Sequence, residues 1–119
     1  MRRPLPRWIA SSTRKRRGKL IVLVRLSPRA LSDLEGLTAY IAADSPQNAR
    51  LVRDRIQAAL LHLTRQPHLG RPGRKEGTRE LIIPRTGDTA AYRVIDTDAG
   101  PEVQVAAIIH GAQRWPDDL

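Results

Sequence analysis

The stretch LSPRALSDLEGLTAYIAADSPQNA (residues 26–49) decides the fold, because it carries one helix-start signal twice. At Ser27-Pro28 and again at Ser45-Pro46, a serine stands where it can cap a helix and a proline follows at the first helical position. The two signals predict two helices separated by a tight break. Such an arrangement is an αα-hairpin.

Apolar residues after each signal recur at the spacing of one helical face. In the first helix the face comprises Ala30, Leu34, Leu37 and Ile41, and Tyr40 extends it. In the second helix the face comprises Ala49, Val52, Ile56, Ala59, Leu60 and Leu63. The second helix is expected to end before Pro67, because the residue before a proline disfavours the helical conformation.

Strand patterns flank the hairpin on both sides. LIVLVRL (20–26) is a short β-branched run that predicts a first strand, and a loop rich in glycine and proline occupies 67–78. Three further strand candidates are TRELIIP (78–84), TAAYRVI (89–95) and EVQVAAIIH (102–110). Their short connectors, RTGD and DTDAGP, make these three strands antiparallel neighbours. The predicted class is therefore α+β, in the order β-α-α-β-β-β, with the helical hairpin packed on one face of a small antiparallel-rich sheet.

Side-chain alternation then predicts which residues face the helices. In the last strand Val103, Val105, Ala107 and Ile109 share an apolar face that is expected under the helices. The alternation places His110 on the opposite, uncovered face. The charge of Arg93 also favours that face, whereas the direction of Arg79 stays open. The hypothesis is a cluster of Arg79, Arg93, His110 and Arg114 on a bare sheet face, with Tyr92 buried.

Composition bounds the class of protein. A chain of 119 residues predicts one domain, and the lack of cysteine excludes disulfides, cysteine-bound zinc and thiol catalysis. We expect no cofactor and no metal. No apolar run approaches the ~20 residues that span a membrane, so no membrane partner is expected.

The net charge of +9 belongs mainly to one end of the chain. Residues 1–19 carry eight basic residues and no acid, whereas residues 20–119 carry thirteen basic and twelve acidic residues. Residues 1–19 are predicted to be a disordered basic extension, and residues 20–119 a single domain. Three interpretations of the extension stay open: upstream sequence outside the fold, a nucleic-acid-binding arm, and an organellar transit peptide.

The body from about Val22 to Pro116 resembles the RelE/ParE superfamily of bacterial type II toxins. The resemblance rests on the order and spacing of LSPRALSDLEGLTAYIAADSPQNA, LTRQPHLGRPGRKEGTRELII, AAYRVI and IIHGAQRWP. It implies a cytoplasmic toxin that a cognate antitoxin holds inactive. The antitoxin is expected to be a DNA-binding dimer, ribbon-helix-helix or similar, through which the complex contacts operator DNA.

The resemblance implies two modes of action. ParE-like members bind DNA gyrase and have no chemistry of their own. RelE-like members are ribosome-dependent mRNA endoribonucleases, and in that case His110, Arg79, Arg93 and Arg114 are the candidate catalytic residues. A histidine can transfer protons at neutral pH, and arginines stabilise charge on a phosphate. A third possibility is an inactive homologue that acts only as a co-repressor.

Two residues at the C-terminal end have simpler explanations. A histidine that ends a strand is more often a hydrogen-bonding residue than a catalyst, and Trp115 is expected to anchor packing or an interface. Together with Arg79, Arg93, His110 and Arg114, Trp115 is assigned to a target or antitoxin interface. The phrasing GRPG…GTREL…YRV…HGAQRWP and the near-neutral body favour the ParE-like mode, since a protein that docks on ribosomal RNA usually carries a strong positive field.

Overall fold

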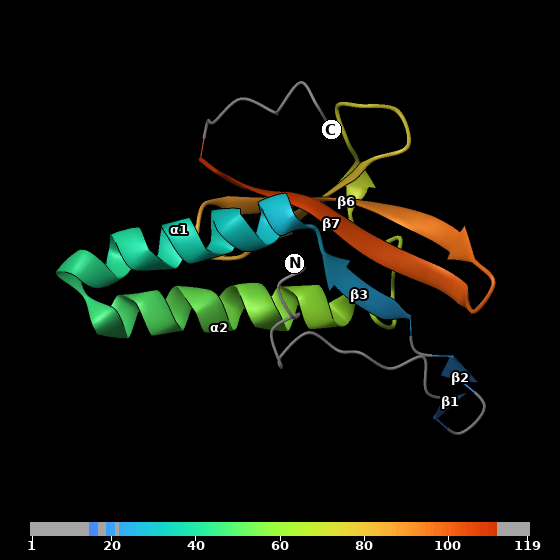
Figure 1. Cartoon of the computed structure of the whole chain (residues 1–119), viewed down its shortest axis with the longest axis horizontal. Helices are drawn as coiled ribbons and strands as arrows, with labels where there is room; N and C mark the ends of the chain where they lie inside the picture. The colour runs from blue at the N-terminus through green and yellow to red at the C-terminus, as the bar shows by residue number, and fades with distance from the viewer. Residues whose placement is uncertain (1–14, 17–18, 21, 112–119) are drawn as a thin grey trace.

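The computed structural model describes residues 15–16, 19–20 and 22–111. Figure 1 labels the secondary-structure elements along the chain. They are β1 (Lys15–Arg16), β2 (Lys19–Leu20), β3 (Leu23–Leu26), α1 (Pro28–Asp44), α2 (Pro46–His62), β4 (Arg71–Pro72), β5 (Arg79–Ile83), β6 (Asp88–Thr97) and β7 (Gly100–His110).

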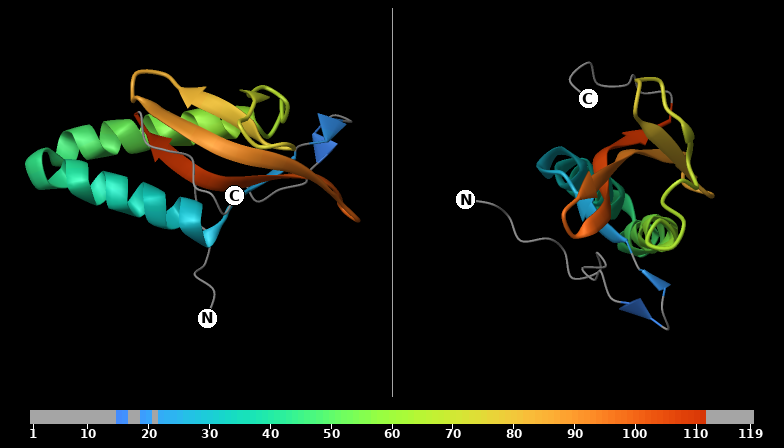
Figure 2. Two further views of the ribbon diagram at one scale, coloured as in Figure 1. Left: turned by 90° about the horizontal axis from the view of Figure 1, so that it is seen from above. Right: turned by 90° about the vertical axis from the view of Figure 1, so that its right-hand side faces the viewer.

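A mixed five-stranded sheet in the order β3-β7-β6-β5-β4 forms the body. β3 pairs with β7 in parallel, and the remaining neighbours pair antiparallel. The two helices form a hairpin along one side of this sheet (Figures 1 and 2). The predicted α+β class, the order of helices and strands, and the antiparallel pairing of the last three long strands are confirmed.

Both helix starts follow the predicted chemistry. The Ser27 hydroxyl accepts a hydrogen bond from the Ala30 N–H at 3.0 Å, and the Ser45 hydroxyl accepts one from the Asn48 N–H at 3.2 Å. A proline follows each serine at the start of the helix. One expectation is wrong: Tyr40 is 80% exposed and does not extend the core face. Its position on α1 turns it away from the stripe formed by Ala30 and Leu34.

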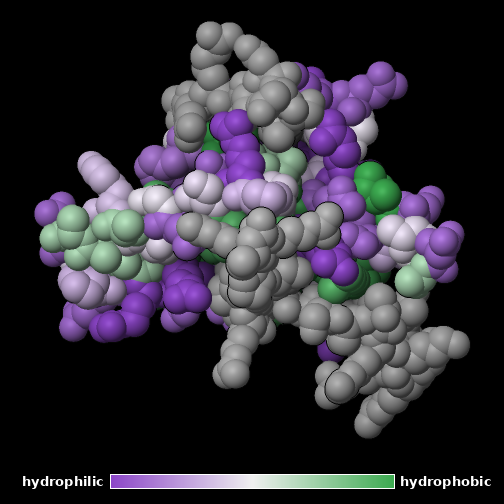
Figure 3. All heavy atoms as spheres, viewed as in Figure 1, coloured by the Kyte–Doolittle hydropathy of each residue, from purple (hydrophilic) through white to green (hydrophobic). Residues whose placement is uncertain are grey.

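The core lies between the hairpin and the sheet. Ile56 and Leu60 of α2 and Leu63, which caps the end of that helix, are buried in one cluster with Val103 and Val105 of β7. Tyr92 is fully buried there, as predicted, and its hydroxyl accepts a hydrogen bond from the Gly70 N–H at 2.8 Å. Figure 3 shows a described surface that is mostly hydrophilic, with hydrophobic residues in small groups.

A β-bulge in β7 corrects the predicted alternation. Ala91 pairs with Ala107, but its neighbour Tyr92 pairs with Val105, so Ala106 is an extra residue. Val105 and Ile108 therefore belong to the helix-side core, whereas Ala107 and Ile109 form a separate cluster with Ala91. The prediction that Ala107 and Ile109 lie under the helices is wrong, because one inserted residue exchanges the two faces beyond it.

The face away from the helices is not bare at its centre. Ala91, Ala107 and Ile109 are buried on that side, with exposed fractions of 0%, 0% and 4%. Glu80, whose register partner is Ala91, is buried as well. The expectation of a fully uncovered sheet face is thus wrong for this central region.

Two short pairings were not predicted. Arg71–Pro72, within the expected loop, pairs with Arg79 and Glu80 as β4. Where the basic extension meets the domain, Lys15–Arg16 and Lys19–Leu20 pair antiparallel as β1 and β2. The rest of residues 1–18 lies outside the described residues, as do Arg114 and Trp115.

Candidate functional site

Arg79 lies on the helix side of the sheet. Its register partner is Tyr92, which belongs to the core, and alternate residues of β5 lie in the same core. The Arg79 guanidinium donates hydrogen bonds to the Gly70 carbonyl at 2.8 Å and the His68 carbonyl at 3.3 Å. Arg79 thus ties the loop after α2 to the sheet.

His110 pairs with Asp88 across the ends of β6 and β7. Their side chains meet with Nδ1 of His110 2.6 Å from Oδ1 of Asp88. The Asp88 side chain is 1% exposed and that of His110 is 63% exposed. The second carboxylate oxygen of Asp88 is buried without a hydrogen-bond partner among the described atoms. A buried carboxylate of this kind needs a partner that can donate, and His110 supplies one.

The bulge also decides the side on which His110 lies. Because Ile108 faces the helix-side core, alternation places His110 on that same side, at the end of the sheet. The prediction of an uncovered-face position for His110 is therefore wrong. Its cause is the extra residue Ala106, which exchanges the faces between Val105 and Ile108.

Arg93 lies on the opposite side of the sheet. It pairs with Gln104, between the core pairs Tyr92–Val105 and Val94–Val103, so alternation directs it away from the helices. The predicted single cluster is consequently not formed by its described members, since Arg79 and His110 share one side and Arg93 occupies the other. Their functional roles stay predictions.

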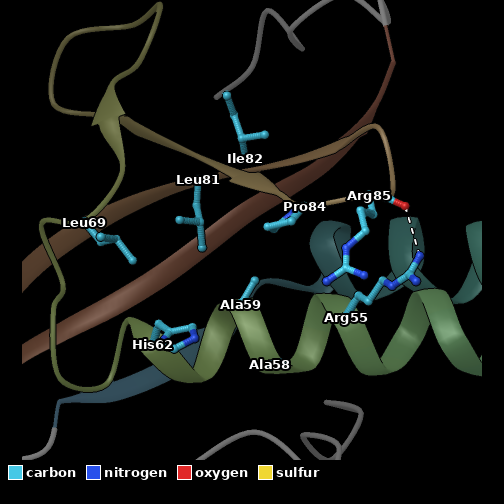
Figure 4. A pocket seen from close by; sticks show the side chains of 9 residues that line it. All are labelled: Arg55, Ala58, Ala59, His62, Leu69, Leu81, Ile82, Pro84 and Arg85. Carbon is cyan, nitrogen blue, oxygen red and sulfur yellow. Dashed lines mark hydrogen bonds between the residues drawn. The ribbon is translucent and has the colours of Figure 1, made fainter.

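A groove between α2 and β5 was missed by the sequence analysis. It has a volume of about 290 Å³ and lies beside the β5–β6 turn (Figure 4). Its lining residues are Arg55, Ala58, Ala59, His62, Leu69, Leu81, Ile82, Pro84 and Arg85. The sequence signal was weak, because Arg55 and Arg85 are thirty residues apart and the turn RTGD indicates only a reversal.

Burial raises the pKa of two side chains outside the groove, those of Tyr92 and Asp33. Burial raises the pKa of the Tyr92 phenol, while the hydrogen bond from Gly70 and the charge of Arg79 act in the opposite direction. Desolvation also raises the pKa of Asp33, which accepts a hydrogen bond from the Ile108 N–H at 3.0 Å. Both groups support packing rather than the groove.

Among the described residues, no three His, Asp or Glu side chains converge where they could hold a metal ion. Neither α1 nor α2 is long and apolar enough to cross a membrane, and no other helix occurs in the described part of the chain.

The sequence of this chain is similar to those of known toxins. Residues 24–115 match the family described as the ParE toxin of the type II toxin-antitoxin system, parDE. A protein of Sinorhizobium fredii (strain NBRC 101917 / NGR234) named putative toxin Y4kP is 35% identical over 96 residues, which cover 81% of this chain and 95% of that relative.

Two solved structures have the same fold. The chromosomal ParDE system from P. aeruginosa superposes with a TM-score of 0.66 at 23% identity, over 76% of this chain and 97% of the other. The toxin-antitoxin complex RelBE2 from Mycobacterium tuberculosis gives a TM-score of 0.52 at 26% identity, over 76% and 99%. The fold and these matches define a toxin of the RelE/ParE superfamily. Within it, the chain belongs to the family of ParE toxins of type II toxin–antitoxin systems.

Proposed function

We propose that this protein inhibits DNA gyrase by binding to it, and that it needs no chemistry of its own. The observation that carries the proposal is the separation of the candidate catalytic groups. Arg79 and His110 lie on the helix side of the sheet, whereas Arg93 lies on the other side. The match to ParE toxins over residues 24–115 supports the same mode of action.

RNA cleavage would require these groups to meet around one phosphate. A general acid or base must lie within hydrogen-bond reach of the proton it transfers, and cations must surround the developing charge. The Arg79 guanidinium instead contacts two loop carbonyls, and the sheet separates it from Arg93. This arrangement favours binding over catalysis.

A cognate antitoxin is the second part of the proposal. The names ParDE and RelBE2 each denote a toxin with its antitoxin, which supports such a partner here. We expect a DNA-binding dimer, ribbon-helix-helix or similar, that neutralises the toxin and carries the complex to operator DNA. Arg79, Arg93, His110, Arg114 and Trp115 were predicted to form the target or antitoxin interface. The proposal retains Arg93, Arg114 and Trp115, because Arg79 contacts two loop carbonyls and His110 pairs with Asp88. The proposed target is a cytoplasmic enzyme.

The test uses purified protein, gyrase and supercoiled plasmid. We expect the wild-type chain to inhibit supercoiling and to trap gyrase-cleaved DNA. The variant His110→Asn keeps a donor for Asp88 but lacks an imidazole, so it should remain folded and equally inhibitory. If the wild-type chain does not inhibit gyrase, the proposal is wrong.

The Asp88–His110 pair favours one alternative, a ribosome-dependent mRNA endoribonuclease. A buried carboxylate orients an exposed imidazole there, as in many proton-transfer sites. In that case the wild-type chain would cut mRNA on translating ribosomes, and His110→Asn would reduce the rate by about a hundredfold or more. Inactivity in both assays, with repression retained in the antitoxin complex, would identify a co-repressor.

A further inference from the structure

The basic extension, residues 1–19, is a part of the chain that the proposed function does not use. It carries eight basic residues and no acid, which accounts for most of the net charge of +9. The match to ParE toxins begins at residue 24, so the matched toxin domain does not include it. In residues 20–119, thirteen basic and twelve acidic residues nearly balance each other. The excess positive charge therefore belongs to a segment that precedes an almost neutral domain.

The end of the extension next to the domain contains a pair of short strands. β1 and β2 form a two-stranded sheet of their own, separate from the five-stranded sheet. Both strands stand clear of the helices and the large sheet, beyond the start of β3 (Figures 1 and 2). The core cluster is built from Val22 and residues that follow it. The charges at β1 and β2 are thus presented outside the packed domain.

Like charges are paired across these two strands. Arg16 pairs with Lys19, and Lys15 pairs with Leu20. Residues directly opposite each other in antiparallel strands share one face, with Cβ atoms about 5 Å apart, and like charges in these positions destabilise the pair. An anion bound to that face would relieve the repulsion. The register therefore favours a negatively charged ligand at the strand pair.

The root of the extension is fixed beside a further cation. The Val22 N–H donates a hydrogen bond at 2.8 Å to the carbonyl of Thr64, just beyond the end of α2. Arg65, the next residue in the chain, is exposed. A ligand held by the extension can therefore also contact the domain at Arg65.

Acids of the domain do not supply the missing negative charge. Glu102 pairs in register with Leu23 at the start of β3, but its carboxylate already contacts the Arg25 guanidinium at 2.9 Å. Asp96 and Asp98 lie near the turn between β6 and β7, toward the same end of the sheet. Two carboxylates cannot balance the eight cations of the extension. A large positive charge is left for an external polyanion.

We propose that the basic extension, together with Arg65, binds the phosphate backbone of duplex DNA without preference for sequence. Duplex DNA carries about one negative charge per 1.7 Å of its axis, and cationic segments bind it by releasing condensed counterions. Eight cations within nineteen residues suit this charge density. Single-stranded RNA fits less well, because its recognition depends on base stacking and the extension has one aromatic residue, Trp8.

The DNA contact adds a tether to the proposed gyrase inhibition. A toxin held on DNA has a higher concentration near an enzyme that acts on the same molecule. This consequence rests on the proposed function. The DNA contact itself depends only on the charges of the extension and of Arg65.

The first experiment measures binding of the whole chain to a duplex of arbitrary sequence by fluorescence anisotropy. The duplex has about 30 base pairs, and the KCl concentration is varied from about 50 to 200 mM. The logarithm of the association constant should fall with the logarithm of the salt concentration, with a slope of about −5 or steeper, because each neutralised phosphate contributes about −0.9. Absence of binding at the lowest salt concentration would overturn the proposal.

Two triple variants with the same change in charge test which cations are involved. One removes three cations from the extension: Lys15→Gln, Arg16→Gln and Lys19→Gln. The control removes three exposed cations from the domain: Arg50→Gln, Arg53→Gln and Arg74→Gln. The first variant should weaken binding by about tenfold or more and make the salt slope shallower by about 3, whereas the control should weaken it by less than about threefold. Equal losses of affinity would overturn the proposal.

The single variant Arg65→Gln tests the contact at the domain. It should weaken binding by about twofold or more and make the slope shallower by about 1. An unchanged affinity would exclude Arg65 from the site.

The second experiment locates the contact by crosslinking. The chain has no cysteine, so Ser12→Cys carries a single photo-crosslinker within the extension. It should crosslink to the duplex on irradiation. Leu51→Cys, on α2 and 45% exposed, is the control that should not. Equal crosslinking at both positions would contradict binding through the extension.

Competing ligands and folding controls complete the test. Single-stranded RNA of the same length and vesicles that contain phosphatidylglycerol are compared with the duplex at one salt concentration. Tighter binding of either one would overturn the assignment to DNA. Circular dichroism and thermal melting should show every variant to be folded, since none of the substituted residues belongs to the core cluster. The assays contain no gyrase, so a failure to bind DNA leaves the proposed gyrase inhibition intact, and a failure to inhibit gyrase leaves the DNA contact intact.

Discussion

Two strands of the sheet run past a shorter neighbour, and their edges end differently. β7 continues beyond β3, and α1 covers its edge: the Ser27 hydroxyl donates to the Ala106 carbonyl at 2.9 Å and Asp33 accepts from the Ile108 N–H at 3.0 Å. β5 continues beyond β4, and the edge at Ile82 faces a groove instead. One edge is covered within the described chain, whereas the β5 edge at Ile82 has no strand partner among the described residues.

The two edges differ in whether polar side chains of the same chain form hydrogen bonds with them. Exposed strand edges invite pairing with other chains, and proteins usually cover them. The β7 edge receives two side-chain hydrogen bonds from the first turns of α1, whereas the β5 edge is bordered by exposed apolar residues and two arginines.

Neighbouring residues of β5 give the largest expected contrast. Ile83 is fully buried in the core and Ile82 is 55% exposed at the groove. Ile83→Ala should lower the free energy of unfolding by about 3 kcal/mol, because it removes buried methyl groups and leaves a cavity. Ile82→Ala should lower it by less than about 1 kcal/mol. Urea denaturation measures both, and equal losses would mean that the β5 edge is not open.

A glycine at the start of the open edge should have the next largest effect. A Cβ on Gly70 would lie 2.7 Å from the Glu80 carbonyl oxygen and 2.8 Å from the Tyr92 ring. Gly70→Ala should therefore cost about 1–3 kcal/mol, as the strand and the buried ring must shift. Gly36→Ala in α1, where nothing lies within 4 Å, should instead stabilise the protein by up to about 1 kcal/mol. Thermal melting compares the two signs directly.

A comparison of the two helix-capping serines distinguishes the stability gained from helix capping from the stability gained by the hydrogen bond to the β7 edge. Ser45 only caps α2, whereas Ser27 caps α1 and also donates to the Ala106 carbonyl of the β7 edge. Ser45→Ala should cost about 1 kcal/mol, and Ser27→Ala about 1 kcal/mol more. Chemical denaturation of both variants tests this difference. A cost for Ser27→Ala no greater than that of Ser45→Ala would show that the β7 edge gains nothing from the hydroxyl.

Asp33 gives the smallest effect, and that effect depends on pH. Desolvation raises the pKa of Asp33 above its ordinary value of 3.8 in the folded protein. Between the ordinary and the raised value the folded state keeps a proton that the unfolded state has lost, so the free energy of unfolding falls as pH rises through that interval. Asp33→Asn keeps an acceptor for Ile108 without this titration. Its stability relative to wild type should therefore improve as pH rises above 3.8, the ordinary pKa of the group, and a constant difference would contradict this account of Asp33.

The sequence predicted those parts of the fold whose signals are local. Ser27-Pro28 and Ser45-Pro46 fix the helix starts through contacts within three residues, and apolar spacing identifies the core positions Ile56 and Leu60. The bulge was hidden because VAAII (105–109) is apolar throughout, so neither face is marked by polarity. One undetected extra residue was enough to put His110 on the wrong side.

The site was less accessible from the sequence, because its contacts are distant along the chain. Asp88 stands in a segment that indicates only a turn, and its pairing with His110 depends on the register of β6 and β7. Arg55 and Arg85 meet only after α2 packs beside β5. The residue types in the sequence predicted a functional role for several arginines and a histidine. The residues that they contact, and the face of the sheet on which they lie, depend on the strand register.

Amide hydrogen exchange, resolved by residue, tests the contrast between the two edges most directly. In the free protein the Ile108 N–H, which donates a hydrogen bond to the Asp33 carboxylate, should exchange slowly. The Ile82 N–H should exchange with little protection. An Ile82 amide as strongly protected as the Ile108 amide would contradict an open β5 edge.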